Sequence, residues 1–352
     1  MSIKFVASIA PNKIYPRHSE GSFIRLKNGS LAFFYSRFHG GSADDSPSDI
    51  VMLSSFDEGE SWGEARQIIS ASEHGVKNIM SVSALRMQNG DLGVIYLVKE
   101  NDGCSTPTLA LSRDEGASFY KKIKIVGDNA RAYYVVNNDR ILRLNSGRLV
   151  LPLTFHRSSE TDDASKRRYD YRGVAVFYLS DDDGITWREA RDIVFAPFAH
   201  TYSGLQENGA IEIRPGLIMG YSRTDKGCQY VYYSFDDGES WTEAMPSSFT
   251  SPCSPLHIRL NKFNNKFYAV YNPIADAGEL KSGNERCPLI YKESSDGLNW
   301  ANAKIIEGDP EHCYCYPAIY FVSANKMLVA YCAGLTQSEG GLSRTNIALI
   351  DI

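Results

Sequence analysis

The chain has 352 residues, of which 37 are Lys or Arg and 42 are Asp or Glu, giving a formal net charge of −5. This acidic balance, without a basic run, argues against a nucleic-acid partner. No segment is long enough to span a membrane, and the apolar run in residues 1–11 is too short for a signal peptide. The seven cysteines have no framework spacing, so we expect reduced thiols in a cytoplasmic protein.

The first predicted element is a hairpin that recurs along the chain, made of an apolar strand, a turn and a second apolar strand. Its first copy turns at Asn28-Gly29, and Asn-Gly between alternating apolar runs is the strongest short-range hairpin signal. We call this element the inner hairpin. Its six copies span residues 23–35, 85–96, 141–151, 211–219, 260–271 and 321–331.

A second phrase alternates with the first and begins as Ser55-Phe-Asp57-Glu-Gly59-Glu-Ser-Trp62. Five copies recur, with their glycines at steps of 57, 68, 54 and 59 residues, and they contain all four tryptophans. The aspartate can accept backbone N–H groups, glycine supplies a positive φ, and the final aromatic pins the turn to the protein body. The phrase therefore predicts a second, outer hairpin. The copies lie at 55–62, 112–119, 180–187, 234–241 and 294–300.

Two hairpins per repeat make a four-stranded sheet, and six repeats over 352 residues average about 59 residues each. We therefore predict an all-β fold, a six-bladed β-propeller of four-stranded antiparallel blades. Length alone allows two or three domains, but a blade cannot bury both of its faces alone. Residues 1–352 are accordingly expected to form one domain, with its chemistry where the connecting loops converge on the axis.

The two phrases and their spacing resemble the sialidase superfamily over essentially the whole chain, the second phrase being the Asp-box of that superfamily. In sialidases a Glu precedes a hairpin that ends in an Arg, as Glu207 and Arg223 do here. A further Arg follows an Asn-Pro and precedes the fifth Asp-box, as Arg286 does. The nucleophilic Tyr stands before the last inner hairpin, and Tyr316 is similar to it.

The resemblance implies a glycosidase in which Tyr316 attacks the sugar and Glu207 takes its proton, the recognised exception to the two-carboxylate mechanism. The acid/base Asp of sialidases lies between the first inner hairpin and the first Asp-box. Asp44 or Asp45 fits that spacing, and Asp49 fits less well. In the same scheme, Arg223 and Arg286 would bind an anionic group through charged hydrogen bonds.

The pattern departs from the superfamily in substrate recognition. Ser19 stands where the first of three carboxylate-binding arginines is expected, with Arg17 two residues upstream as a substitute. Ser81 stands where sialidases usually have an Asp. Arg37 stands where the basic residue that usually neighbours this Asp is expected. The polar run before the third inner hairpin should face the axis. It adds two candidate substrate contacts, Asn138 and Arg140.

The leading hypothesis is an exo-acting glycoside hydrolase that removes a sialic acid or another acidic terminal sugar, with lyase or inverting variants left open. The alternative is a non-catalytic glycan-binding propeller, and a protein-interaction propeller comes third. The histidines show no metal-ligand spacing, and we expect His39, His156 and His200 to be loop or pocket-wall residues. No metal or cofactor is expected, and the predicted partner is a glycan or small oligosaccharide.

Overall fold

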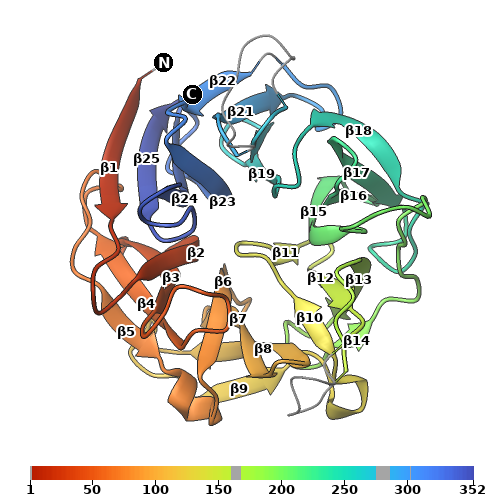
Figure 1. The fold of residues 1–352 in the computed structure, drawn as a ribbon, viewed down its shortest axis with the longest axis horizontal. Coiled ribbons are helices and arrows are strands. Elements are labelled where there is room, and N and C mark those ends of the chain that lie inside the picture. The colour runs from red at the N-terminus through yellow and green to blue at the C-terminus, as the bar shows by residue number, and fades with distance from the viewer. Residues whose placement is uncertain (1, 160–167, 275–285, 302) are drawn as a thin grey trace.

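The computed structural model describes residues 2–159, 168–274, 286–301 and 303–352. These residues form antiparallel β-sheets that stand in a ring around a central axis (Figure 1). The helical elements of the described chain are two short 3₁₀ helices, η1 (Ala71–His74) and η2 (Asp128–Ala130). Among the described residues, no helix has the length and apolar character needed to cross a membrane. The predicted all-β class is confirmed.

We number the sheets 1 to 6 in chain order, and the strand that begins each inner hairpin lies nearest the axis (Figure 1). Two parallel bridges, Ser48 with Asn78 and Tyr133 with Ser105, link sheets 1 to 3 into one hydrogen-bonded sheet of 13 strands. Sheet 1 contains β2 (Arg17–Arg25), β3 (Leu31–Phe38), β4 (Ser48–Ser55) and β5 (Arg66–Ile69). Sheet 2 contains β6 (Asn78–Arg86), β7 (Leu92–Asn101), β8 (Cys104–Ser112) and β9 (Lys121–Lys124). Sheet 3 contains β10 (Tyr133–Val135), β11 (Leu142–Arg143), β12 (Leu149–His156), β13 (Val174–Ser180) and β14 (Arg188–Glu189). Sheet 4 contains β15 (Gln206–Arg214), β16 (Leu217–Arg223), β17 (Cys228–Ser234) and β18 (Met245–Thr250). Sheet 5 contains β19 (His257–Asn261), β20 (Lys266–Tyr271), β21 (Leu289–Ser294) and β22 (Lys304–Glu307).

Sheet 6 joins the two ends of the chain. It contains β23 (His312–Phe321), β24 (Lys326–Leu335), β25 (Thr345–Asp351) and the N-terminal strand β1 (Ile3–Ile9). Strand β1 pairs antiparallel with β25, from Ile3 opposite Ile350 to Ile9 opposite Thr345. The N-terminal strand therefore completes the last sheet and closes the ring.

Both predicted hairpins are present. The inner hairpins join the first two strands of each sheet, as in β2–β3, except in sheet 3, where the hairpin joins β11 to β12. The Asp-box phrases join the last two strands of sheets 1 to 5, as in β4–β5. In the first Asp-box, Oδ1 of Asp57 accepts the Ser61 N–H at 2.9 Å, and Gly59 has φ 88°. Glu58 also has a positive φ, of 59°, so the turn needs two left-handed residues where the sequence predicted one.

Apolar clusters fill the spaces between neighbouring sheets. One cluster joins Phe33 and Leu31 of sheet 1 to Leu328 and Ile347 of sheet 6. The Asp-box aromatics add to these clusters, since the Trp241 ring stacks on Phe177 of the preceding sheet at 4.0 Å. The sheets are thus fixed relative to one another, and the inner strands hold their side chains at constant positions around the axis.

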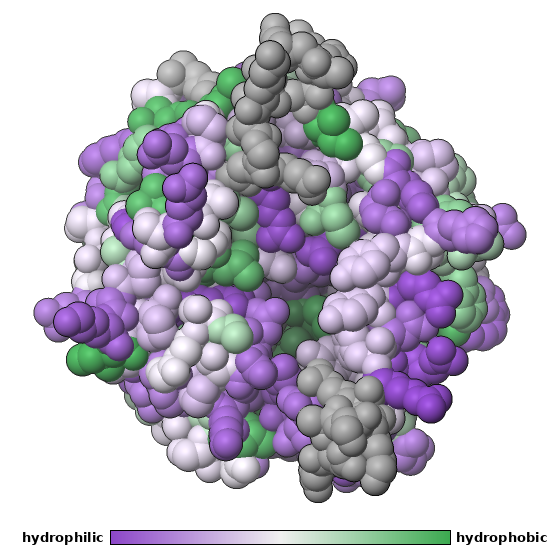
Figure 2. Space-filling model, viewed as in Figure 1, coloured by the Kyte–Doolittle hydropathy of each residue, from purple (hydrophilic) through white to green (hydrophobic). Residues whose placement is uncertain are grey.

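The inner strands share an unusual backbone feature near the axis. Four of them contain a register shift, and in each shift a non-glycine residue has a positive φ. Bulges of this kind re-aim side chains beside functional sites, and each such residue costs on the order of 1–3 kcal/mol. These residues are Glu20 (61°), Ser81 (62°), Glu207 (50°) and Tyr316 (53°). Figure 2 shows the face of the molecule hollowed near its centre.

Candidate active site

The four left-handed residues of the inner strands line one cavity of about 230 Å³. The cavity wall thus contains residues from the strands of sheets 1, 2, 3, 4 and 6, and loops of sheets 1 and 3 complete it. The lining residues are Glu20, Asp44, Met80, Ser81, Leu97, Lys99, Ser105, Tyr133, Tyr134, Val135, Asn137, His156, Tyr169, Tyr171, Gln206, Glu207, Arg223 and Tyr316. We call this space the central cavity.

Tyr316, Glu207 and Arg223 form a connected group in the central cavity. The Tyr316 hydroxyl donates to Oε1 of Glu207 at 2.8 Å, and Nη1 of Arg223 lies 2.7 Å from the same oxygen. Nη2 of Arg223 donates to Gln206 at 2.7 Å, which fixes the guanidinium orientation. Oε2 of Glu207 is buried and has no hydrogen-bond partner among the described residues. A carboxylate held this way can accept the phenolic proton.

The Tyr316 hydroxyl carries its proton in the resting site. Burial, with the charge of Glu207, raises the pKa of Tyr316 well above its ordinary value, against the opposing effect of Arg223 and Arg286. The Arg286 guanidinium lies 5.8 Å from the centre of the Tyr316 ring, so it adds positive charge beside the phenol. The phenol can therefore act as a nucleophile only if its proton moves to Glu207 as the new bond forms.

Of the three candidate acid/base aspartates, Asp44 lines the central cavity. Its side chain is 68% exposed, and its Oδ1 accepts Nη1 of Arg17 at 2.5 Å. Asp45 is exposed and is not among the lining residues. Asp49 is engaged elsewhere, because its Oδ1 accepts the N–H of Ala71 at 2.8 Å. The geometry thus favours Asp44 as the residue that reaches a substrate.

Glu20 is a cavity residue that the sequence did not single out. Its Oε1 lies 3.2 Å from Nη2 of Arg17, and its Oε2 accepts the Ser81 hydroxyl at 2.9 Å. Burial raises the pKa of Glu20 to about 7, although Arg17 opposes that shift. The predicted substitute arginine, Arg17, is thus buried against two acidic side chains, Glu20 and Asp44.

A regular spacing could have identified Glu20. Glu20 and Ser81 each precede the turn glycine of their inner hairpin, Gly29 and Gly90, by nine residues. The same interval separates Glu207 from Gly216 in sheet 4. The interval does not hold in sheet 3, where Asn138 stands nine residues before Gly147 and does not line the central cavity.

Five of the predicted substrate contacts are not among the residues that line the central cavity: Arg17, Arg37, Asn138, Arg140 and Arg286. The Asn138 side chain donates to the backbone oxygens of Gly21 at 2.8 Å and Tyr316 at 3.3 Å, so it supports the strained Tyr316 backbone. Arg140 is buried and donates to the Leu256 carbonyl at 2.7 Å. Arg37 lies over the ring of Tyr15 at 4.1 Å.

His156 forms part of the cavity wall, as predicted. Its Nδ1 lies 3.0 Å from the Asp170 carbonyl, which can only accept, so Nδ1 carries a proton. Burial lowers the pKa of His156, and the neutral ring therefore presents Nε2 as an acceptor. Within the described residues, no group of three or more His, Cys, Asp or Glu is arranged to hold a metal ion.

Solved structures with this fold include sialidases. A Dyadobacter fermentans protein of unknown function superposes with a TM-score of 0.73 at 16% identity, over 99% of each chain. The Hadza microbial sialidase Hz136 gives 0.72 at 18%, over 96% of this chain and 66% of its own. The K499G mutant of the NanB sialidase of Streptococcus pneumoniae gives 0.69 at 14%, over 99% and 70%. The fold is therefore sialidase-like, at low sequence identity.

Sequence comparison gives a more limited result. No curated protein matches the chain. The family model described as a BNR repeat-like domain matches residues 30–328. This range includes all five Asp-box phrases, four of the six inner hairpins in full and parts of the first and last. The match covers far more than half of the sequence. The chain therefore belongs to the BNR repeat-like domain family.

Proposed function

We propose that this protein is an exo-acting glycoside hydrolase of the sialidase type, built as one six-bladed β-propeller over residues 1–352. The observation that carries the proposal is the hydrogen bond of 2.8 Å from Tyr316 to Glu207, set beside Arg223 in a polar cavity. A glycan-binding protein needs no phenol paired with a buried carboxylate. The closure of the ring by β1 and β25 supports a single domain.

In the first step, the Tyr316 oxygen attacks the anomeric carbon as Glu207 takes the phenolic proton. The bond to the leaving oxygen breaks, and a proton from Asp44 passes to that oxygen. Arg223, 2.7 Å from Glu207, holds that carboxylate in place before the transfer. In the second step, Asp44 takes a proton from water, whose oxygen displaces Tyr316, and Glu207 returns the proton to the phenol.

The proposed substrate carries an acidic terminal sugar. Arg223 and Arg286 flank Tyr316, and the charged hydrogen bonds they could make contribute roughly 1.5–3 kcal/mol each. A neutral phenol attacks an anionic sugar without the repulsion that a carboxylate would meet. Glu20 has a pKa of about 7, so near pH 7 a fraction of its carboxyl groups is protonated and can donate a hydrogen bond. It stands in the region where sialidases have their first arginine.

One observation favours the alternative, a glycan-binding protein without turnover. Arg17 is bonded to both Glu20 and Asp44, so the candidate acid/base residue is already engaged by an arginine. In that arrangement Asp44 would position a ligand without delivering a proton. A test of turnover separates the two functions.

The experiment measures hydrolysis of chromogenic glycosides, including an α-sialoside and α- and β-uronides, by the wild type and by Tyr316→Phe. Cleavage by the wild type that is lost in Tyr316→Phe would support the proposal and name the sugar. An inactive wild type that still binds glycans, with no change in Tyr316→Phe, would refute catalysis and favour the binding function.

A further inference from the structure

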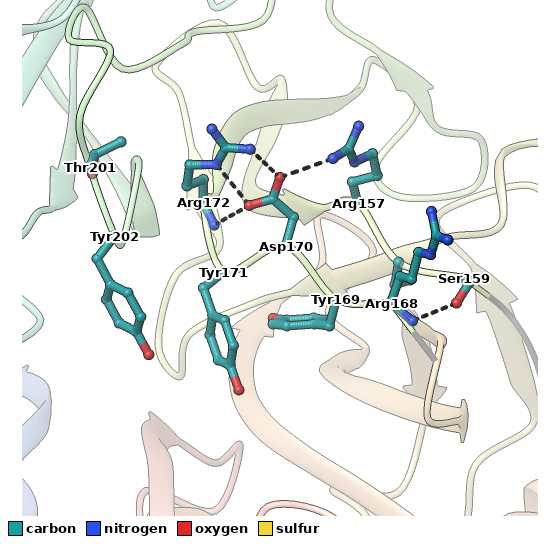
Figure 3. A pocket seen from close by; sticks show the side chains of 10 residues that line it. Arg157, Ser159, Arg168, Tyr169, Asp170, Tyr171, Arg172, Thr201 and Tyr202 are labelled. Atoms are coloured by element: carbon teal, nitrogen blue, oxygen red, sulfur yellow. Dashed lines mark hydrogen bonds and ion pairs between the residues drawn. The ribbon is translucent and has the colours of Figure 1, made fainter. Parts of the chain in front are cut away.

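A second cavity of about 600 Å³ lies beside the central cavity (Figure 3). Tyr169 and Tyr171 line both cavities, so the two cavities adjoin at these side chains. We call this space the side cavity. Its lining residues are Arg157, Ser158, Ser159, Arg168, Tyr169, Asp170, Tyr171, Arg172, Thr201 and Tyr202.

One wall of the side cavity is aromatic. The rings of Tyr171 and Tyr202 are stacked, with centroids 5.4 Å apart and an interplanar angle of 17°. They are 54% and 67% exposed, and Figure 3 shows them side by side with their hydroxyls pointing the same way. Tyr169 packs edge-on against Tyr171 at 4.9 Å and supports the pair. Flat rings with a polar tip suit the apolar face and the hydroxyls of a sugar.

Another part of the lining is basic. Asp170 accepts Nε of Arg172 at 2.9 Å and Nη2 at 2.7 Å, and it lies 3.5 Å from Nη2 of Arg157 (Figure 3). Arg168 is a third cation among the described lining residues, where Asp170 is the sole acidic group. The described lining thus carries three positive charges against one negative. An anionic group is attracted to such a wall.

We propose that the side cavity is the leaving-group subsite for an acidic oligosaccharide. The terminal sugar occupies the central cavity, the next sugar stacks on Tyr171 and Tyr202, and an acidic substituent on the leaving group faces Arg157 and Arg168. This assignment rests on the proposed function, since it takes Tyr316 as the point of cleavage. It predicts that the protein distinguishes substrates by the leaving group on the far side of the scissile bond.

The test compares kcat/KM for three probes that share one terminal sugar, methyl α-sialoside, sialyllactose and disialyllactose. Their leaving groups are a methanol, a neutral disaccharide and an acidic trisaccharide. Tyr202→Ala should lower kcat/KM about fivefold for both oligosaccharides and leave the methyl glycoside unchanged, since one aromatic contact is lost. Arg157→Gln should lower it for disialyllactose alone. Arg191→Gln, an exposed arginine outside both cavities, is the matched control.

Equal losses on all three probes, or no loss with any variant, would overturn the subsite and leave the proposed function intact. If the wild type cleaves none of the probes, the subsite is tested by calorimetric titration of disialyllactose and tetragalacturonate. Weaker binding of either glycan by Tyr202→Ala would still support the side cavity as a glycan subsite. Equal binding by the wild type and Tyr202→Ala, or no binding, would overturn it.

Discussion

Replacing Glu20 by Gln should change the pH dependence of stability. Glu20 is 6% exposed, and burial raises its pKa from 4.5 to about 7. Between these values the unfolded chain loses the Glu20 proton while the folded protein keeps it. The contribution of Glu20 to the free energy of unfolding is therefore fully present below pH 4.5 and is lost as the pH rises through 7. The loss amounts to about 3 kcal/mol, at about 1.4 kcal/mol per pKa unit.

The assay is urea unfolding of the wild type and Glu20→Gln at pH 5 and pH 8. Glutamine has no proton to lose, so the advantage of the wild type over the variant should shrink by about 2.5 kcal/mol between the two pH values. Glu64→Gln, at an exposed glutamate, is the control, and its difference from the wild type should stay constant. A Glu20→Gln difference that does not change with pH would refute the reasoning. A wild-type advantage that grows with pH would show that the ion pair with Arg17 outweighs burial.

Three further changes test the site and the fold. Arg223→Lys, which loses one of the two contacts to Glu207 and Gln206, should lower kcat/KM about 10- to 100-fold without shifting the urea midpoint. Asp236→Ala removes the acceptor of three Asp-box hydrogen bonds, and it should lower the free energy of unfolding by about 1–2 kcal/mol in urea titrations. Trp241→Ala removes the ring stacked on Phe177 and should cost about 2–4 kcal/mol in the same assay, whereas Trp241→Phe should recover much of that loss.

The hairpins could be predicted because their determinants are local. An Asn-Gly turn such as Asn28-Gly29 and an Asp-box such as that of Asp57 fix their own backbone within a few residues, whatever surrounds them. The number of sheets could then be counted from the repeats. The closure by β1 was not predicted, because residues 3–9 lie outside both repeated phrases and their pairing with β25 is seen only in the structure.

The details of the site depend on contacts between distant segments. Arg17 reaches Asp44 and Glu20 reaches Ser81, 61 residues away, because a bulge turns Glu20 toward the axis. Arg140 was expected at the axis as a substrate contact, yet it binds the Leu256 carbonyl, 116 residues away. Residue position along a strand gives the face of a side chain but not its partner.

The side cavity shows the same limit. Its described walls come from residues 157–159 and 168–172 and from Thr201 and Tyr202, in two connections between strands. Neither connection carries a repeated phrase, so no sequence pattern indicated that Tyr171 and Tyr202 would stack. Only the packing of the two connections against each other brings the rings to 5.4 Å.

The central claim is that Tyr316 forms a covalent bond to the sugar. The direct measurement is mass spectrometry of the protein after incubation with a difluorinated analogue of whichever sugar the glycoside panel identifies, together with peptide mapping. We expect one sugar adduct on the peptide containing Tyr316 and no adduct on Tyr316→Phe. An adduct on Glu20 or Glu207, or full turnover by Tyr316→Phe, would contradict the claim.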